Sequence, residues 1–173
     1  MIRCSVFAHD QGMIVIVIPG RATEALVLLN DADLTRGMDQ LEAIERQAGE
    51  VHSLYFETLA AVTRAVVYAQ IATGEAKGSI GVLVRNLGFA MGRARRASQT
   101  ARDSLAALSA NLPPDLEGLR FMIEFEFAKL LIKRKEWDEA RKHIEKAIAF
   151  LQPLGDSAGV RNATVLLATV EAK

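Results

Sequence analysis

The feature of this chain that most constrains its fold is the stretch of residues 121–153, FMIEFEFAKLLIKRKEWDEARKHIEKAIAFLQP. Its apolar and charged residues are distributed as in two short amphipathic helices. The charged run around Lys135 separates the two apolar patterns, so we expect a turn there. The stretch therefore predicts a helical hairpin, and with it a chain built mainly from packed helices.

The composition also favours helices that pack closely in a chain long enough for a core. The 173 residues suffice for one compact domain or a short run of helical repeats. Hydrophobic residues make up 50% of the chain but aromatic residues only 6%, and Ala, Leu and Val dominate. The formal net charge is +0, so no overall field draws the chain to nucleic acid or to a membrane.

The sequence predicts a cytoplasmic protein, because nothing in it directs the chain elsewhere. The single cysteine, Cys4, excludes an internal disulfide and fits a reducing compartment. The longest early apolar run, residues 13–18, is much shorter than the roughly 18 apolar residues of a membrane span. The same run is also too short for the core of a signal peptide.

Residues 1–30 are expected to form an N-terminal, strand-like extension. Apolar and β-branched residues within residues 2–18 flank a turn-forming cluster at residues 9–12, which predicts a short β-hairpin or an extended segment. A lone hairpin is marginally stable in water, so docking on the helices, exchange with a second copy and a free extension all stay open. The apolar run at residues 22–29 fits a helix or a strand equally well.

Residues 31–173 are expected to form one α-helical repeat domain. Asp31 or Asp33 is suited to cap the first helix, whose apolar residues recur at spacings of three and four. Pro113 and Pro114 end the third helical region. The expected helices cover about residues 33–48, 52–73, 79–111, 115–134, 137–151 and 157–172.

The order of small and bulky residues in residues 121–153 resembles one tetratricopeptide repeat, a helix-turn-helix unit that stacks with neighbouring copies. In that family, paired small residues let the two helices approach closely, and an aromatic residue stands near the turn. Lys135 replaces the usual turn glycine, and Glu124 stands where a bulky apolar residue is common. The matching positions are Phe127, Ala128, Leu131, Trp137, Ala140, Ile144, Ala147 and, one position late, Pro153.

A spacing of 40 residues extends this resemblance along the chain. Bulky–small pairs occur at Leu87-Gly88, Phe127-Ala128 and Leu167-Ala168. The resemblance covers residues 79–173 well and residues 31–78 weakly. It implies an all-α fold of antiparallel helix-turn-helix repeats in a TPR-like array.

The resemblance further implies a groove, lined by the first helix of each repeat, in which a protein or peptide binds. The expected function is a non-enzymatic scaffold that mediates protein–protein interaction and needs no cofactor. A basic wall in the groove would suit a peptide carboxylate. The residues that match groove-facing positions are Arg85, Phe89, Arg93, Met122, Phe125, Lys129, Lys133 and Asn162.

Charge is distributed unevenly between two stretches of the chain. Residues 77–102 carry six basic residues and no acidic one, whereas residues 31–50 carry six acidic residues and two arginines. Neutralisation within one molecule is the favoured interpretation, and contact with a charged partner is the alternative. Stacking aromatics do not interleave the arginines at 93–102, so nucleic acid is not the expected partner.

No set of residues reaches the strength of a catalytic or metal-binding signature. His9, His52 and His143 lie in separate elements, and none has Cys, Asp or Glu at metal-ligand spacing. We interpret His143 as an exposed surface residue of its helix. The sequence therefore predicts neither an enzyme nor a metal site.

Two alternatives to the scaffold stay open. The first is a small self-associating regulatory or chaperone-like bundle, in which the N-terminal strands exchange between copies. Its basis is the wide apolar arc of the last helix, which favours a homodimer. The second is a ligand sensor or enzyme with a pocket between the strands and the helices.

Overall fold

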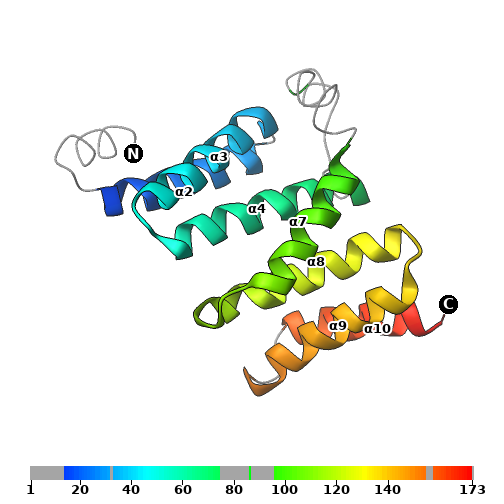
Figure 1. The fold of residues 1–173 in the computed structure, drawn as a ribbon. Helices are drawn as coiled ribbons and strands as arrows, with labels where there is room; N and C mark the ends of the chain where they lie inside the picture. Colours follow the sequence, from blue (N-terminus) through cyan, green and yellow to red (C-terminus); the bar gives the residue numbers. More distant parts are fainter. Residues whose placement is uncertain (1–13, 32, 75–85, 87–95, 155–157, 173) are drawn as a thin grey trace. The chain divides into compact units, whose positions relative to one another are not determined.

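The computed structural model describes residues 14–31, 33–74, 86, 96–154 and 158–172, and every regular element within them is a helix (Figure 1). The expected all-α class is therefore confirmed. In chain order the α-helices are α2 (Ile14–Asn30), α3 (Leu34–Glu50), α4 (Leu54–Thr73), α7 (Ala97–Asn111), α8 (Arg120–Lys133), α9 (Trp137–Leu151) and α10 (Ala158–Glu171).

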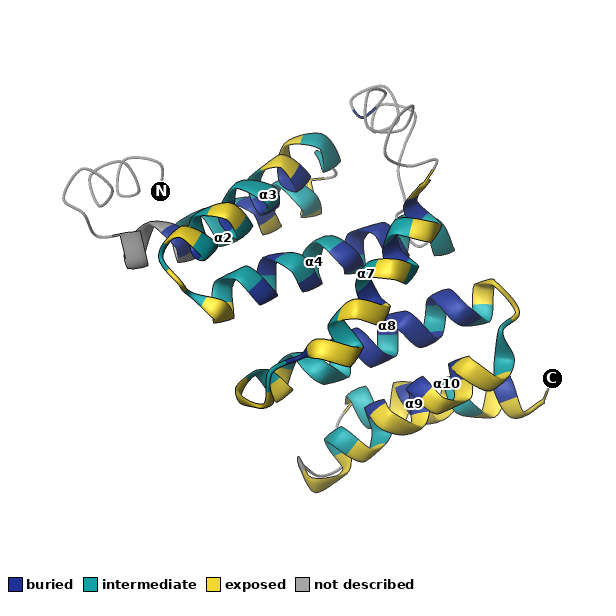
Figure 2. Cartoon of the chain, viewed as in Figure 1, coloured by how far each residue is buried: buried dark blue, intermediate teal, exposed yellow. Residues whose placement is uncertain are grey.

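These helices belong to two compact units. The first unit contains α2, α3 and the part of α4 that ends at Arg64. The second unit contains the remainder of α4, from Ala65, together with α7, α8, α9 and α10. Each unit has its own buried residues, which Figure 2 marks in dark blue along the helices.

The expected strand in residues 2–18 is wrong for the part that the structure describes. Residues 14–18 begin α2, and the helix continues through residues 22–29 to pack along α3. A short apolar run has no period that separates a strand from a buried helix, and burial decided the outcome, since Ile18 is 1% exposed. Residues 2–13 lie outside the described part of the chain.

Helix α3 begins and packs as its sequence predicts. The carboxylate of Asp33 accepts a hydrogen bond from the backbone N–H of Arg36 at 3.3 Å, which caps the first turn. One face of the helix is buried, and Arg21 and Gln40 form polar contacts between α2 and α3 at its edges. The buried face consists of Gly37, Met38, Leu41, Ile44 and Ala48.

Gly37 leaves room for the side chain of Leu29 on α2. A Cβ atom at this position would lie 2.7 Å from both Cγ and Cδ2 of Leu29 on α2. Carbon atoms do not approach so closely, so a larger residue at position 37 would displace the Leu29 side chain. Gly49 on the same helix has space for a Cβ, because its nearest neighbour, Glu57, would be 4.0 Å away.

The second unit is built from helices that pack against their neighbours in the sequence. Helix α7 ends at Asn111, and Leu112 is extended before Pro113, as expected for a residue that precedes proline. The next helix was expected from residue 115, and this start is wrong. Residues Pro114–Leu119 form a 3₁₀ segment, where Leu116 leaves the helical region, and α8 begins only at Arg120.

The expected hairpin in residues 121–153 is present as the antiparallel pair α8 and α9. Lys135 takes the left-handed conformation between them, with φ of 63°, and so performs the role expected of a turn glycine. The small residues at the helix contact are fully buried, as the sequence predicts. The buried matching positions are Phe127, Ala128, Leu131, Ala140, Ile144 and Ala147.

Helix α10 packs antiparallel to α9 in this unit. Gly159 permits the approach, because a Cβ there would lie 2.6 Å from Cδ1 of Leu151 and 3.1 Å from Cζ of Phe121. At the other end of α10, Glu171 accepts a hydrogen bond from Arg141 of α9 at 3.3 Å. None of the helices in the described ranges is both long and apolar enough to cross a bilayer.

We expect Gly37→Ala to destabilise the first unit, whereas Gly49→Ala should stabilise it. Alanine at a helical position favours folding by up to about 1 kcal/mol relative to glycine. At position 37 overpacking against Leu29 costs about 1–3 kcal/mol and outweighs this gain. Urea unfolding of both variants measures the difference. Equal stabilisation by the two substitutions would contradict the close contact at Gly37.

Candidate partner-binding face of helix α8

The sequence-derived groove residues that the structure describes lie mainly on one stripe of α8. Met122, Phe125, Lys129 and Lys133 follow one another at spacings of three and four, so they share a side of the helix. The first three are half-buried and Lys133 is exposed. Asn162 is exposed on α10, and Arg85, Phe89 and Arg93 lie outside the described residues.

Helix α8 is apolar on its accessible side as well as on its packed side. Its packed side contains Ile123, Phe127 and Leu130, which are at most 6% exposed. On the other side, apolar residues are only half-buried, and they include Met122 and Phe125. Helix α9 differs, because the residues exposed on it are mostly charged: Asp138, Glu139, Arg141, Lys142, Glu145 and Lys146.

Aromatic and charged contacts fix the side chains of this stripe. The rings of Phe121 and Phe125 stack with centroids 5.3 Å apart and planes at 19°. The ammonium group of Lys129 lies 5.7 Å from the centroid of the Phe125 ring and donates to both carboxylate oxygens of Glu126 at 3.1 Å. Lys133 makes no ion pair with any residue that the structure describes. The stripe thus offers a fixed aromatic surface and one accessible positive charge.

The structure also reveals a buried polar chain that sequence reasoning missed. His143 was interpreted as an exposed residue, and this is wrong, because it is 7% exposed. Its Nδ1 atom lies 2.5 Å from Oε2 of Glu124, whose side chain is fully buried. The hydroxyl of Ser109 donates to Oε1 of Glu124 at 2.6 Å. The sequence did contain a signal for this polar chain. Glu124 stands at a position where the repeat family carries an apolar residue, so its side chain could be expected to be buried.

The contacts of Glu124 outweigh the cost of its burial. Burial alone would raise the pKa of Glu124, but the hydrogen bonds with His143 and Ser109 favour the carboxylate and bring the pKa below its ordinary value of 4.5. The positive charge of Lys146 acts in the same direction. Arg120 adds an ion pair at 3.8 Å. The carboxylate is therefore a junction that joins α7, α8 and α9.

The contacts among Ser109, Glu124 and His143 differ from those of a nucleophilic catalytic triad. A serine nucleophile requires its hydroxyl to face a general base such as histidine, whereas Ser109 donates to the carboxylate. The ring of His143 packs against Phe127, with centroids 4.3 Å apart, in the interior of the unit. The geometry therefore supports a structural role for the polar chain.

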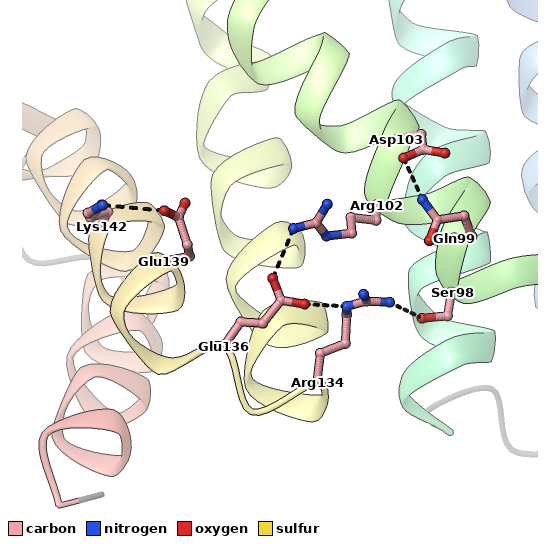
Figure 3. A network of polar contacts seen from close by, with 8 residues as sticks. All are labelled: Ser98, Gln99, Arg102, Asp103, Arg134, Glu136, Glu139 and Lys142. Carbon is pink, nitrogen blue, oxygen red and sulfur yellow. Dashed lines mark hydrogen bonds and ion pairs between the residues drawn. The ribbon is translucent and has the colours of Figure 1, made fainter.

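A second polar network holds α7 to the turn between α8 and α9 (Figure 3). Glu136 accepts hydrogen bonds from Arg134 and from Arg102, the latter at 2.9 Å, and these two bonds lower the pKa of Glu136. Arg134 also donates to Ser98 at 3.3 Å. On the outer face of α9, Lys142 pairs with Glu139 at 3.3 Å. The network orients the end of α8 at which Lys133 is exposed.

In the described part of the chain, no group of three or more His, Cys, Asp or Glu residues is placed to hold a metal ion. Comparison with known proteins found no matching family model, no matching curated protein and no matching solved structure.

We expect His143→Leu to destabilise the second unit by about 3–5 kcal/mol, because it leaves the Glu124 carboxylate buried without its main partner. The double variant Glu124→Leu with His143→Leu should recover most of this loss, since it removes both polar groups together. Thermal unfolding monitored by circular dichroism provides the measurement.

Lys142→Leu on the same helix is the matched control. It removes the partner of an exposed glutamate, Glu139, and should cost less than about 1 kcal/mol. If His143→Leu lowered the free energy of unfolding no more than Lys142→Leu does, the buried contact would contribute little to stability.

Proposed function

We propose that this chain is a helical scaffold that binds a partner protein through the accessible stripe of α8. The observation that carries the proposal is that α8 is apolar on both sides. Ile123, Phe127 and Leu130 are buried on its packed side, whereas Met122 and Phe125 on the accessible side are only half-buried. Exposed apolar surface bordered by polar groups is typical of protein interaction sites.

The same arrangement supports a TPR-like array as the architecture. The hairpin of α8 and α9 has its small residues buried at the positions that match the repeat family. In such an array α10 would be the first helix of a following repeat, and Asn162 lies on it. We infer that a protein or peptide segment binds along α8, with its apolar side chains on Phe125 and Met122.

The charge of the stripe suggests which residues orient the partner. Lys129 is already bonded to Glu126 and lies over Phe125, so it holds the aromatic surface in place. Lys133 is accessible and is suited to pair with a carboxylate of the partner. Phe125 is the expected energetic anchor, because buried aromatic residues dominate most interfaces.

A photo-crosslinker tests this proposal in cells that produce the chain. With benzoylphenylalanine in place of Met122, we expect a covalent adduct with one protein, identified by mass spectrometry. The same crosslinker in place of Glu145, on the exposed side of α9, is the control and should not yield that adduct.

Phe125→Ala combined with Lys133→Glu should reduce the yield of the Met122 adduct at least about tenfold, given the usual effect of a hot-spot residue. Lys133 is chosen because Lys129→Glu would place two glutamates together and disturb the fold. An adduct formed equally at both positions, or one that survives the double substitution, would contradict the proposal.

A further inference from the structure

Ser98 lies at the start of α7, where an arginine that follows α8 reaches its hydroxyl group (Figure 3). It is the second residue of the helix, and its side chain is half-buried. Arg134 donates from Nη1 to the hydroxyl oxygen of Ser98 at 3.3 Å, and this contact is exposed to solvent. A guanidinium group thus lies within hydrogen-bond distance of an accessible hydroxyl.

The two arginines on this side of α7 have hydrogen-bond donors to spare. Arg102, one turn after Ser98 on the helix, donates to Glu136 at 2.9 Å, and Arg134 donates to Glu136 and Ser98. The Nε–H group of Arg102 is buried and has no hydrogen-bond partner among the described residues. A guanidinium group has more donors than these contacts use, so the pair can accept a further anion.

The charges around Ser98 also favour an anion. Within the described part of the chain, Glu136 is the carboxylate that bonds both arginines, so two positive groups face one negative group. Asp103, the other carboxylate beside the network, accepts a hydrogen bond from Gln99 at 2.8 Å. The start of α7 adds partial positive charge, because its N-cap residue, Arg96, makes no side-chain bond to the free N–H groups of the first turn.

The sequence before Ser98 suits a protein kinase that selects basic substrates. Residues 93–98 read Arg-Ala-Arg-Arg-Ala-Ser, so arginines precede the serine by two, three and five positions. Kinases of this class bind such arginines through their own carboxylates. Only the first turn of α7 has to open for Ser98 to enter a kinase site, and the ends of helices open at little cost.

We propose that Ser98 is a phosphorylation site and that Arg134 and Arg102 bind the phosphate group. A protein kinase transfers the γ-phosphoryl group of ATP: the serine hydroxyl gives its proton to the base of the kinase, the bond from Oγ to phosphorus forms, and ADP leaves. The phosphate then accepts hydrogen bonds from Arg134 and competes with Glu136 for both guanidinium groups. Phosphorylation therefore changes how α7 is held to the turn between α8 and α9, and the site does not depend on the stripe of α8.

A kinase reaction tests whether the folded chain accepts the phosphoryl group. The full chain is incubated with Mg²⁺, ATP and the catalytic domain of an arginine-directed serine kinase, and its peptides are then analysed by mass spectrometry. We expect phosphate on Ser98, and Ser98→Ala should remove that phosphopeptide. Thr100 is the internal control, because it lacks arginines two and three positions before it, and should stay unmodified. A folded chain without phosphate on Ser98 would overturn the proposal.

Phosphorus-31 NMR of the phosphorylated chain tests whether the arginines bind the phosphate. A free phosphoserine has a second pKa of about 6. In the folded chain we expect this pKa to fall by about one pH unit, because the guanidinium groups and the start of α7 favour the doubly charged phosphate. Unfolding in urea should return the pKa to its ordinary value.

Two variants of the phosphorylated chain identify the residue responsible. Arg134→Gln should reverse at least about half of the shift in the phosphoserine pKa. Lys142→Gln removes a positive charge from the outer face of α9, where it pairs with Glu139, and should leave that pKa unchanged. Circular dichroism melts verify that both variants are folded. A phosphoserine pKa that is the same in the folded chain and in urea, or that does not respond to Arg134→Gln, would overturn the proposal.

Discussion

The buried contact between Glu124 and His143 is the interaction on which the second unit depends. A glutamate with a fully buried side chain is tolerated only where its oxygens are paired, and here His143 of α9 and Ser109 of α7 provide the partners. The contact therefore links three helices at one point.

Close approach of small residues completes this arrangement. Ala128, Ala140 and Ala147 are fully buried, so α8 and α9 lie near enough for the polar contact to form. One side of α8 packs in this core. Phe125 and Met122 lie on its other side and are half-buried. The proposed partner-binding stripe is thus a consequence of how the hairpin packs.

Much of the helical structure could be predicted from the sequence, because helix period, capping and proline positions are local signals. The cap at Asp33 and the end of α7 before Pro113 follow from such signals. Residues 14–18 were mistaken for a strand, because a short apolar run has no distinguishing period. The burial of His143 was missed since it depends on Glu124, a residue 19 positions away in the sequence.

The most direct test of this account is the titration of the Glu124 side-chain carboxyl, followed by carbon-13 NMR in the folded chain. We predict a pKa below the ordinary value of 4.5, because the hydrogen bonds outweigh burial. The unfolded chain then binds more protons, so the stabilisation is present above pH 4.5 and is lost as the pH falls through the folded pKa. A pKa above 4.5, as burial alone would produce, would contradict the central role of this contact.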